Sequence, residues 1–171
     1  MPVAEQMGKQ FRLLTDWYLS VLDGIRPEDG RKVLRDNTNS LEWLAGHLLV
    51  IRSRNTVRLG QPVAPFRYLD TFVDQTLPPP SFRAFDSQTV YPSLAECAEQ
   101  WLSYSTAFSN ALEAADEPIL QRELALSGPT GGNTVADLLT SMVLHEAFHI
   151  GQMSLLRKAL GYPAMYWFHR P

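Results

Sequence analysis

The longest helical pattern in the chain, from Thr134 to Leu160, carries two histidines on its apolar stripe. His145 and His149 are four residues apart, so on an α-helix they lie one turn above each other and both imidazoles can reach one point. The apolar members of the stripe are Leu138, Met142, Met153, Leu156 and Leu160. A neutral imidazole that faces the interior needs a partner, because an unpaired polar group is costly to bury. The spacing is typical of a metal site, and only His47 and His169 remain as a third ligand.

Three further stretches show helical periodicity. They are residues 7–25, ending near Gly24, residues 39–60, and residues 93–117. We expect Asn39 to cap the second helix, and Ser93 with Glu96 three positions later has the capping-box pattern. The sequence has no convincing strand pattern and no internal repeat. Four long helices therefore predict an all-α four-helix bundle, and the length of residues 1–171 fits a single domain.

The connection between the second and third helices, residues 61–92, is long and contains six prolines and six aromatic residues. A disordered linker would be poor in aromatic residues, so we expect an ordered crossover that packs along the body. A link of this length can run the whole bundle, which predicts parallel second and third helices and up-down-down-up order. The other long connection, residues 116–133, fits either a short hairpin or an irregular loop.

This topology places three histidines at one depth. His47 lies about 18–20 Å from the C-terminal end of the second helix, given a rise of about 1.5 Å per residue. His145 and His149 lie about 16–23 Å from the N-terminal end of the fourth helix. If these two helices are antiparallel, the depths coincide, and the three side chains can meet.

Composition excludes several classes of protein. A net charge of −3, with scattered lysines and arginines, lacks the basic footprint of a nucleic-acid-binding protein. No stretch approaches the roughly 18 apolar residues of a membrane span, and no leader pattern is visible, so we expect a cytoplasmic protein without membrane contact. The single cysteine, Cys97, fits a reducing compartment, and we expect it to be a small buried hydrophobic residue.

The sequence resembles the DinB-like (YfiT-like) superfamily over nearly its whole length. The resemblance is carried by Asn39 with Trp43-Leu44-Ala45-Gly46-His47-Leu48, by His145-Glu146-Ala147-Phe148-His149-Ile150-Gly151-Gln152, and by Leu155-Leu156-Arg157. It implies an up-down-down-up four-helix bundle, commonly dimeric, with a divalent metal held by His47, His145 and His149. We therefore expect a homodimer and a zinc or nickel site. The family's known activities are mostly thiol chemistry with bacillithiol, mycothiol or glutathione, with a few hydrolases.

A metal held by three imidazoles keeps open positions, and these define the chemistry that is available. It can lower the pKa of bound water toward 7, or hold a substrate thiol as thiolate. The resemblance favours the second route, a thiol S-transferase that acts on a small molecule. A metal-dependent hydrolase is the alternative, and so is a non-enzymatic bundle with a structural or vestigial metal. No catalytic side chain beyond the metal ligands is assigned.

The letters His145-Glu146-x-x-His149 also spell the zincin protease motif. No acidic residue follows Glu146, Leu155 stands where a metzincin would place its third histidine, and no strand is available to hold a peptide. These features disfavour a protease. Glu146 lies about 100° round the helix from His145. We expect it on the shoulder of the site, where it orients a ligand or pairs with an arginine. His169 is expected to be exposed or at an interface.

Overall fold

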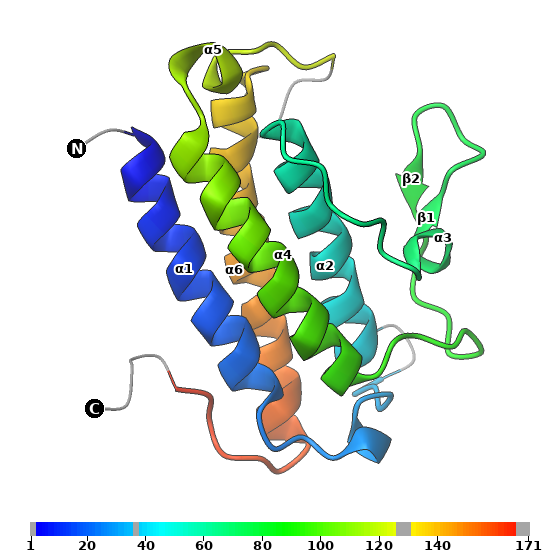
Figure 1. Cartoon of the computed structure of the whole chain (residues 1–171). Helices are drawn as coiled ribbons and strands as arrows, with labels where there is room; N and C mark the ends of the chain where they lie inside the picture. The colour runs from blue at the N-terminus through cyan, green and yellow to red at the C-terminus, as the bar shows by residue number, and fades with distance from the viewer. Residues whose placement is uncertain (1–2, 36–37, 126–130, 167–171) are drawn as a thin grey trace.

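The computed structural model describes residues 3–35, 38–125 and 131–166. Four long helices form a bundle: α1 (Val3–Leu22), α2 (Leu41–Arg58), α4 (Leu94–Ala114) and α6 (Val135–Ala159). In Figure 1, α1 and α6 run in one direction and α2 and α4 in the other. α2 packs against α4 and α6, and α1 packs against the same two helices. The predicted all-α bundle with up-down-down-up order is confirmed, and α2 and α6 are antiparallel neighbours.

The crossover between α2 and α4 is ordered, as predicted. It contains the short helix α3 (Leu69–Phe72) and a two-residue antiparallel ladder of β1 (Val73–Asp74) with β2 (Ser81–Phe82). Phe72 and Val73 are fully buried, which explains why a segment rich in proline stays packed beside α2 (Figure 1). The ladder is too small to change the fold class.

The remaining short elements lie in the other connections. A 3-10 turn, η1 (Pro27–Asp29), follows α1, and α5 (Glu117–Leu120) follows α4. The sequence did not indicate α5. An isolated antiparallel bridge pairs Glu123 with Thr134 across the last long connection, and residues 126–130 between them lie outside the described residues.

The helix starts follow from local capping chemistry, with one correction. The prediction that Asn39 caps α2 is wrong: the Ser40 hydroxyl accepts the hydrogen bond from the Trp43 backbone N–H, and Ser40 directly precedes the first helical residue. The capping box predicted at Ser93 is confirmed. α6 begins with a second capping box, in which Thr134 and Asp137 satisfy each other's backbone N–H groups.

Aromatic side chains fill the centre of the bundle. Tyr18 of α1 stacks on Trp101 of α4, with ring centroids 4.0 Å apart. Cys97 is buried, and burial raises the pKa of its thiol, so it is the inert small residue that was expected. At the C-terminal side, the Tyr166 backbone N–H donates to the Ser20 hydroxyl on α1 at 2.7 Å, so the tail lies on its own body as far as that residue.

Two further predictions concern His169 and membrane-spanning helices. His169 lies outside the described residues, so its predicted position, exposed or at an interface, stays a prediction. Within the part of the chain that the structure describes, no helix is long and apolar enough to cross a membrane.

Candidate metal centre

Three histidines from two helices converge on one point. His47 comes from α2, and His145 and His149 come from successive turns of α6. The Nε2 atom of His145 is 3.4 Å from Nε2 of His47 and 3.2 Å from Nε2 of His149. One ring nitrogen of each histidine lies within 4.8 Å of the others. The structure thus brings together the three residues that the depth count placed at one level.

The spacing of these nitrogens fits a metal ion. Zinc binds imidazole nitrogen at about 2.0–2.1 Å in tetrahedral geometry, so two of its nitrogen ligands are about 3.3 Å apart. The two separations from Nε2 of His145, 3.4 and 3.2 Å, lie on either side of this value. Hydrogen bonds among the three Nε2 atoms cannot satisfy all of them. In a neutral imidazole each ring nitrogen either donates one hydrogen bond or accepts one, so Nε2 of His145 can pair with only one of its two neighbours. The donor set and its geometry therefore fit a divalent cation.

Gln152 sets the tautomer of one ligand. Its side-chain oxygen lies 2.7 Å from Nδ1 of His149, so Nδ1 carries the proton and donates, and Nε2 keeps its lone pair for the common point. Gln152 stands three residues after His149, one turn along the helix, and that spacing was the available sequence signal. Among the described residues, Nδ1 of His47 and Nδ1 of His145 are buried without a hydrogen-bond partner.

All three imidazoles are held neutral, the form that binds metal. Burial, with smaller contributions from the neighbouring His149 and His145, lowers the pKa of His47 to about 3. Burial, with a contribution from His149, lowers the pKa of His145 to about 4. Burial also lowers the pKa of His149, although its hydrogen bond with Gln152 opposes that change. No proton has to leave at neutral pH before a cation binds.

Aromatic rings surround His47 and limit the access of water. Trp43, one turn earlier on α2, stacks on the His47 ring at 5.0 Å and 8°. Phe82 of β2 lies 4.4 Å from the same ring, so the crossover supplies part of the wall. Phe148 packs edge-on against His149 at 5.4 Å. The site lies at the side of the bundle, between α2, α6 and the crossover.

A fully buried ion pair of α2 and α6 includes Glu146, the neighbour of His145 in the sequence. Arg52 and Glu146 have fully buried side chains, and Nε and Nη2 of Arg52 donate to the two carboxylate oxygens at 2.9 and 2.5 Å. The other terminal nitrogen lies 3.3 Å from the hydroxyls of Thr15 on α1 and Ser105 on α4. The guanidinium also lies 4.2 Å from the centre of the Trp101 ring. One arginine therefore connects all four helices.

This pair corrects two expectations. Glu146 was expected on the shoulder of the site, but it is fully buried, while His145 and His149 are half-buried on the side of α6 that faces α2. Of the two roles predicted for it, the structure shows the pairing with an arginine. Burial raises the pKa of Glu146, and the guanidinium of Arg52 opposes that rise. Arg52 lies four residues after Leu48 on the buried face of α2, although a charged residue is generally expected at the surface.

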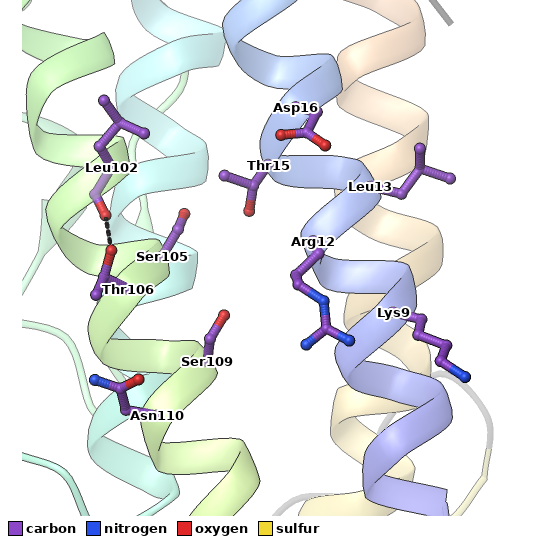
Figure 2. Close-up of a pocket in the computed structure, with 10 residues that line it drawn as sticks. All are labelled: Lys9, Arg12, Leu13, Thr15, Asp16, Leu102, Ser105, Thr106, Ser109 and Asn110. Carbon is purple, nitrogen blue, oxygen red and sulfur yellow. Dashed lines mark hydrogen bonds between the residues drawn. The ribbon is translucent and has the colours of Figure 1, made fainter. Parts of the chain in front are cut away.

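A separate groove of about 670 Å³ lies between α1 and α4 (Figure 2). Its lining residues are Lys9, Arg12, Leu13, Thr15, Asp16, Leu102, Ser105, Thr106, Ser109 and Asn110. The groove reaches Thr15 and Ser105, the hydroxyl partners of Arg52, and it contains none of the three histidines. This groove is therefore distinct from the candidate metal centre.

The fold and the site together define a class: up-down-down-up four-helix bundles with a histidine cluster between the second and fourth helices. A model of the DinB superfamily matches residues 10–153. The chain belongs to the DinB superfamily. No curated protein matches the sequence.

Two solved structures share the fold. A DinB-like protein, YjoA from Bacillus subtilis, has a TM-score of 0.66 and 17% identity, over 96% of this chain and 99% of its own. YfiT from Bacillus subtilis, described as "a probable metal-dependent hydrolase with an unusual four-helix bundle topology", has a TM-score of 0.63 and 15% identity, over 93% of this chain and 90% of its own.

Proposed function

We propose that this chain binds a divalent metal, zinc or nickel, through His47, His145 and His149 and is a metal-dependent enzyme that acts on a small molecule. The observation that supports this is the convergence of three imidazoles, in which Nε2 of His145 lies from Nε2 of His47 and of His149 at the separation that a tetrahedral ion requires. Imidazole suits both metals, and selection between them depends on geometry and supply. The three low histidine pKa values support the same proposal, because they keep the ligands in their binding form.

Thiol S-transfer is the reaction we favour, with a low-molecular-weight thiol as one substrate. When bound, the metal would supply a Lewis acid that keeps a thiol ionised at neutral pH. Gln152 orients the ring of His149 for this purpose. Trp43 and Phe82 cover His47 and reduce the water that competes for the open positions. The resemblance to a family of thiol-using enzymes supports transfer over hydrolysis.

A metal-dependent hydrolase is the second candidate, and the description of YfiT favours it. A non-enzymatic bundle is the third. A structural zinc is normally closed by four protein ligands, whereas the described residues bring three to this point. That difference supports a site with an open position, and hence an enzyme.

Metal analysis of untagged protein, purified without chelator, tests the metal. We expect close to one equivalent, and strong loss in His47→Ala, His145→Ala and His149→Ala. His169→Ala is the matched control and should retain the metal. Less than about a tenth of an equivalent in the native protein, with no uptake of added zinc or nickel, would remove the proposal. Loss of a free thiol in the presence of an electrophile, compared with ester hydrolysis on the same preparation, then separates the two reactions.

We also propose a homodimer, supported by the outer face of α6. Leu144, Phe148 and Leu155 are 66, 64 and 62% exposed, and Gly151 lies between them on the same side of the helix. Their 4-3-4 spacing aligns them along one face. A helix that is apolar on its solvent side as well as its core side is normally covered, and a second copy offers the same face in return.

A further inference from the structure

A second hollow lies between the C-terminal half of α2 and the start of the crossover, further along α2 from His47. Its volume is about 400 Å³. The lining is mostly apolar and is formed by Val57, Val63, Ala64, Pro65, Phe66 and Leu69, together with Ser53. Two charged groups complete it, Arg54 and Arg58. An apolar pocket with a few convergent polar groups is the usual form of a small-molecule site.

Neither arginine has a carboxylate partner among the described residues. Arg58 donates to the side-chain oxygen of Asn55 at 3.0 Å, and the Arg54 guanidinium lies 5.5 Å from the centre of the Phe82 ring. Burial lowers the pKa of both groups, and the charge on Arg54 lowers that of Arg58 further. Both guanidinium groups stay protonated at any physiological pH. Two half-buried positive charges therefore lie side by side without a neutralising anion.

The arginines are aligned with the metal centre. Arg54 follows His47 by seven residues and Arg58 follows it by eleven, so each lies within about 20° of His47 around the axis of α2 and all three are on one face. The rise along the helix is about 10 Å from His47 to Arg54 and about 16 Å to Arg58. Phe82 contacts both His47 and Arg54 and joins the two sites. A small molecule about 10 Å long that lay along α2 would meet the histidines at one end and Arg54 at the other.

We propose that Arg54 and Arg58 bind an oxyanion group of the substrate, a carboxylate or a phosphate, which lies about 10 Å from the atom that meets the histidines. The planar, always charged guanidinium matches the two oxygens of such a group. The apolar lining holds the chain that joins the two ends. The anion site is inferred from the pocket itself, and its assignment to the substrate rests on the proposed function.

The anion site is tested first without metal, by calorimetric titration. The probes are S-methylglutathione, which keeps both carboxylates but has no free thiol, and inorganic phosphate. We expect Arg54→Gln and Arg58→Gln each to lower the affinity of the preferred probe at least about tenfold, since a hydrogen bond to a charged group contributes about 1.5–3 kcal/mol. Arg54→Lys keeps the charge and should lose less. Arg12→Gln, which removes the same charge on α1, is the matched control and should change nothing.

The preferred probe identifies the oxyanion, since a carboxylate site favours S-methylglutathione and a phosphate site favours phosphate. Absence of binding by either probe to the native chain would overturn the inference. So would an equal loss in Arg12→Gln, because the effect would then be net charge alone. Circular dichroism of each variant shows whether it is folded, and Arg54→Lys supplies the comparison if Arg54→Gln is not.

The link to the substrate is tested on zinc-loaded protein with glutathione and its diethyl ester, which keeps the thiol and removes the carboxylate charges. We expect glutathione to bind at least about tenfold more tightly than the ester, and Arg54→Gln to abolish that preference without changing zinc affinity. If the native chain takes up no zinc, the proposed function fails while the metal-free titration still decides the anion site. If zinc binds and the ester binds equally well, the inference fails and the proposed function stands.

Discussion

The buried pair of Arg52 and Glu146 makes a sharp prediction about stability. Replacing Arg52 with Met keeps much of the side-chain volume and removes the guanidinium. Glu146 then loses two charge-assisted hydrogen bonds, at 2.9 and 2.5 Å, in a position with no access to water. At about 1.5–3 kcal/mol for each bond, the loss is about 3–6 kcal/mol. Breaking one side of a buried pair costs about 3–5 kcal/mol in other proteins, so two routes give the same magnitude.

We expect Arg52→Met to lower the free energy of unfolding by about 3–5 kcal/mol, a large part of the about 5–15 kcal/mol that is typical of a domain. The assay is urea unfolding of metal-free protein, followed by circular dichroism at neutral pH. The slope against denaturant should stay constant, because the same surface is exposed. Glu146→Gln should also destabilise the fold, because it leaves the Arg52 guanidinium buried without its carboxylate and keeps only one acceptor oxygen for the two N–H donors.

The double variant Arg52→Met, Glu146→Leu is the control. Replacing a whole buried pair with apolar side chains of similar volume is often neutral, or stabilising by about 1–4 kcal/mol. We therefore expect the second substitution to restore most of what the first removes, and the two effects to be strongly non-additive. If the double variant lowers the free energy of unfolding by the sum of the losses in Arg52→Met and Glu146→Leu, the cost comes from packing and not from an unpaired charge. A loss below about 1 kcal/mol in Arg52→Met would also refute the reasoning.

Three further predictions concern pH, assembly and packing. Burial holds the pKa of His47 at about 3, below the roughly 6.5 of an unfolded chain, so the unfolded state binds more protons between these values. The free energy of unfolding of the metal-free protein should be highest above about pH 6.5 and should fall by up to about 4 kcal/mol toward pH 3. A urea midpoint that falls by the same amount in His47→Gln as in the native chain would contradict this. Leu144→Glu should convert the proposed dimer to monomer in light scattering, whereas Leu102→Glu, on the exposed face of α4, should not. Gly46→Ala should lower the free energy of unfolding by about 1–3 kcal/mol, measured by urea titration, because the new Cβ would overlap the buried ring of Phe72.

The sequence by itself determined the bundle and the meeting of the histidines, because both depend on regular geometry. Helical periodicity fixed the number of long helices, and the capping pattern at Ser93 fixed one helix start to the residue. The length of the crossover, residues 61–92, set the relative direction of the helices on either side of it. A constant rise per residue then placed His47 level with His145.

Only the tertiary structure decided which polar side chains are inside. Arg52 and Glu146 are 94 residues apart, and a charged residue taken alone is expected at the surface. The sequence gives the angle between His145 and its neighbour Glu146, but the partner across the bundle decides which of the two faces the core. The same holds for Arg54 and Arg58, whose isolation from any described carboxylate follows from where the crossover packs against α2. Pairing across space is not encoded in local periodicity, because it depends on which surfaces meet.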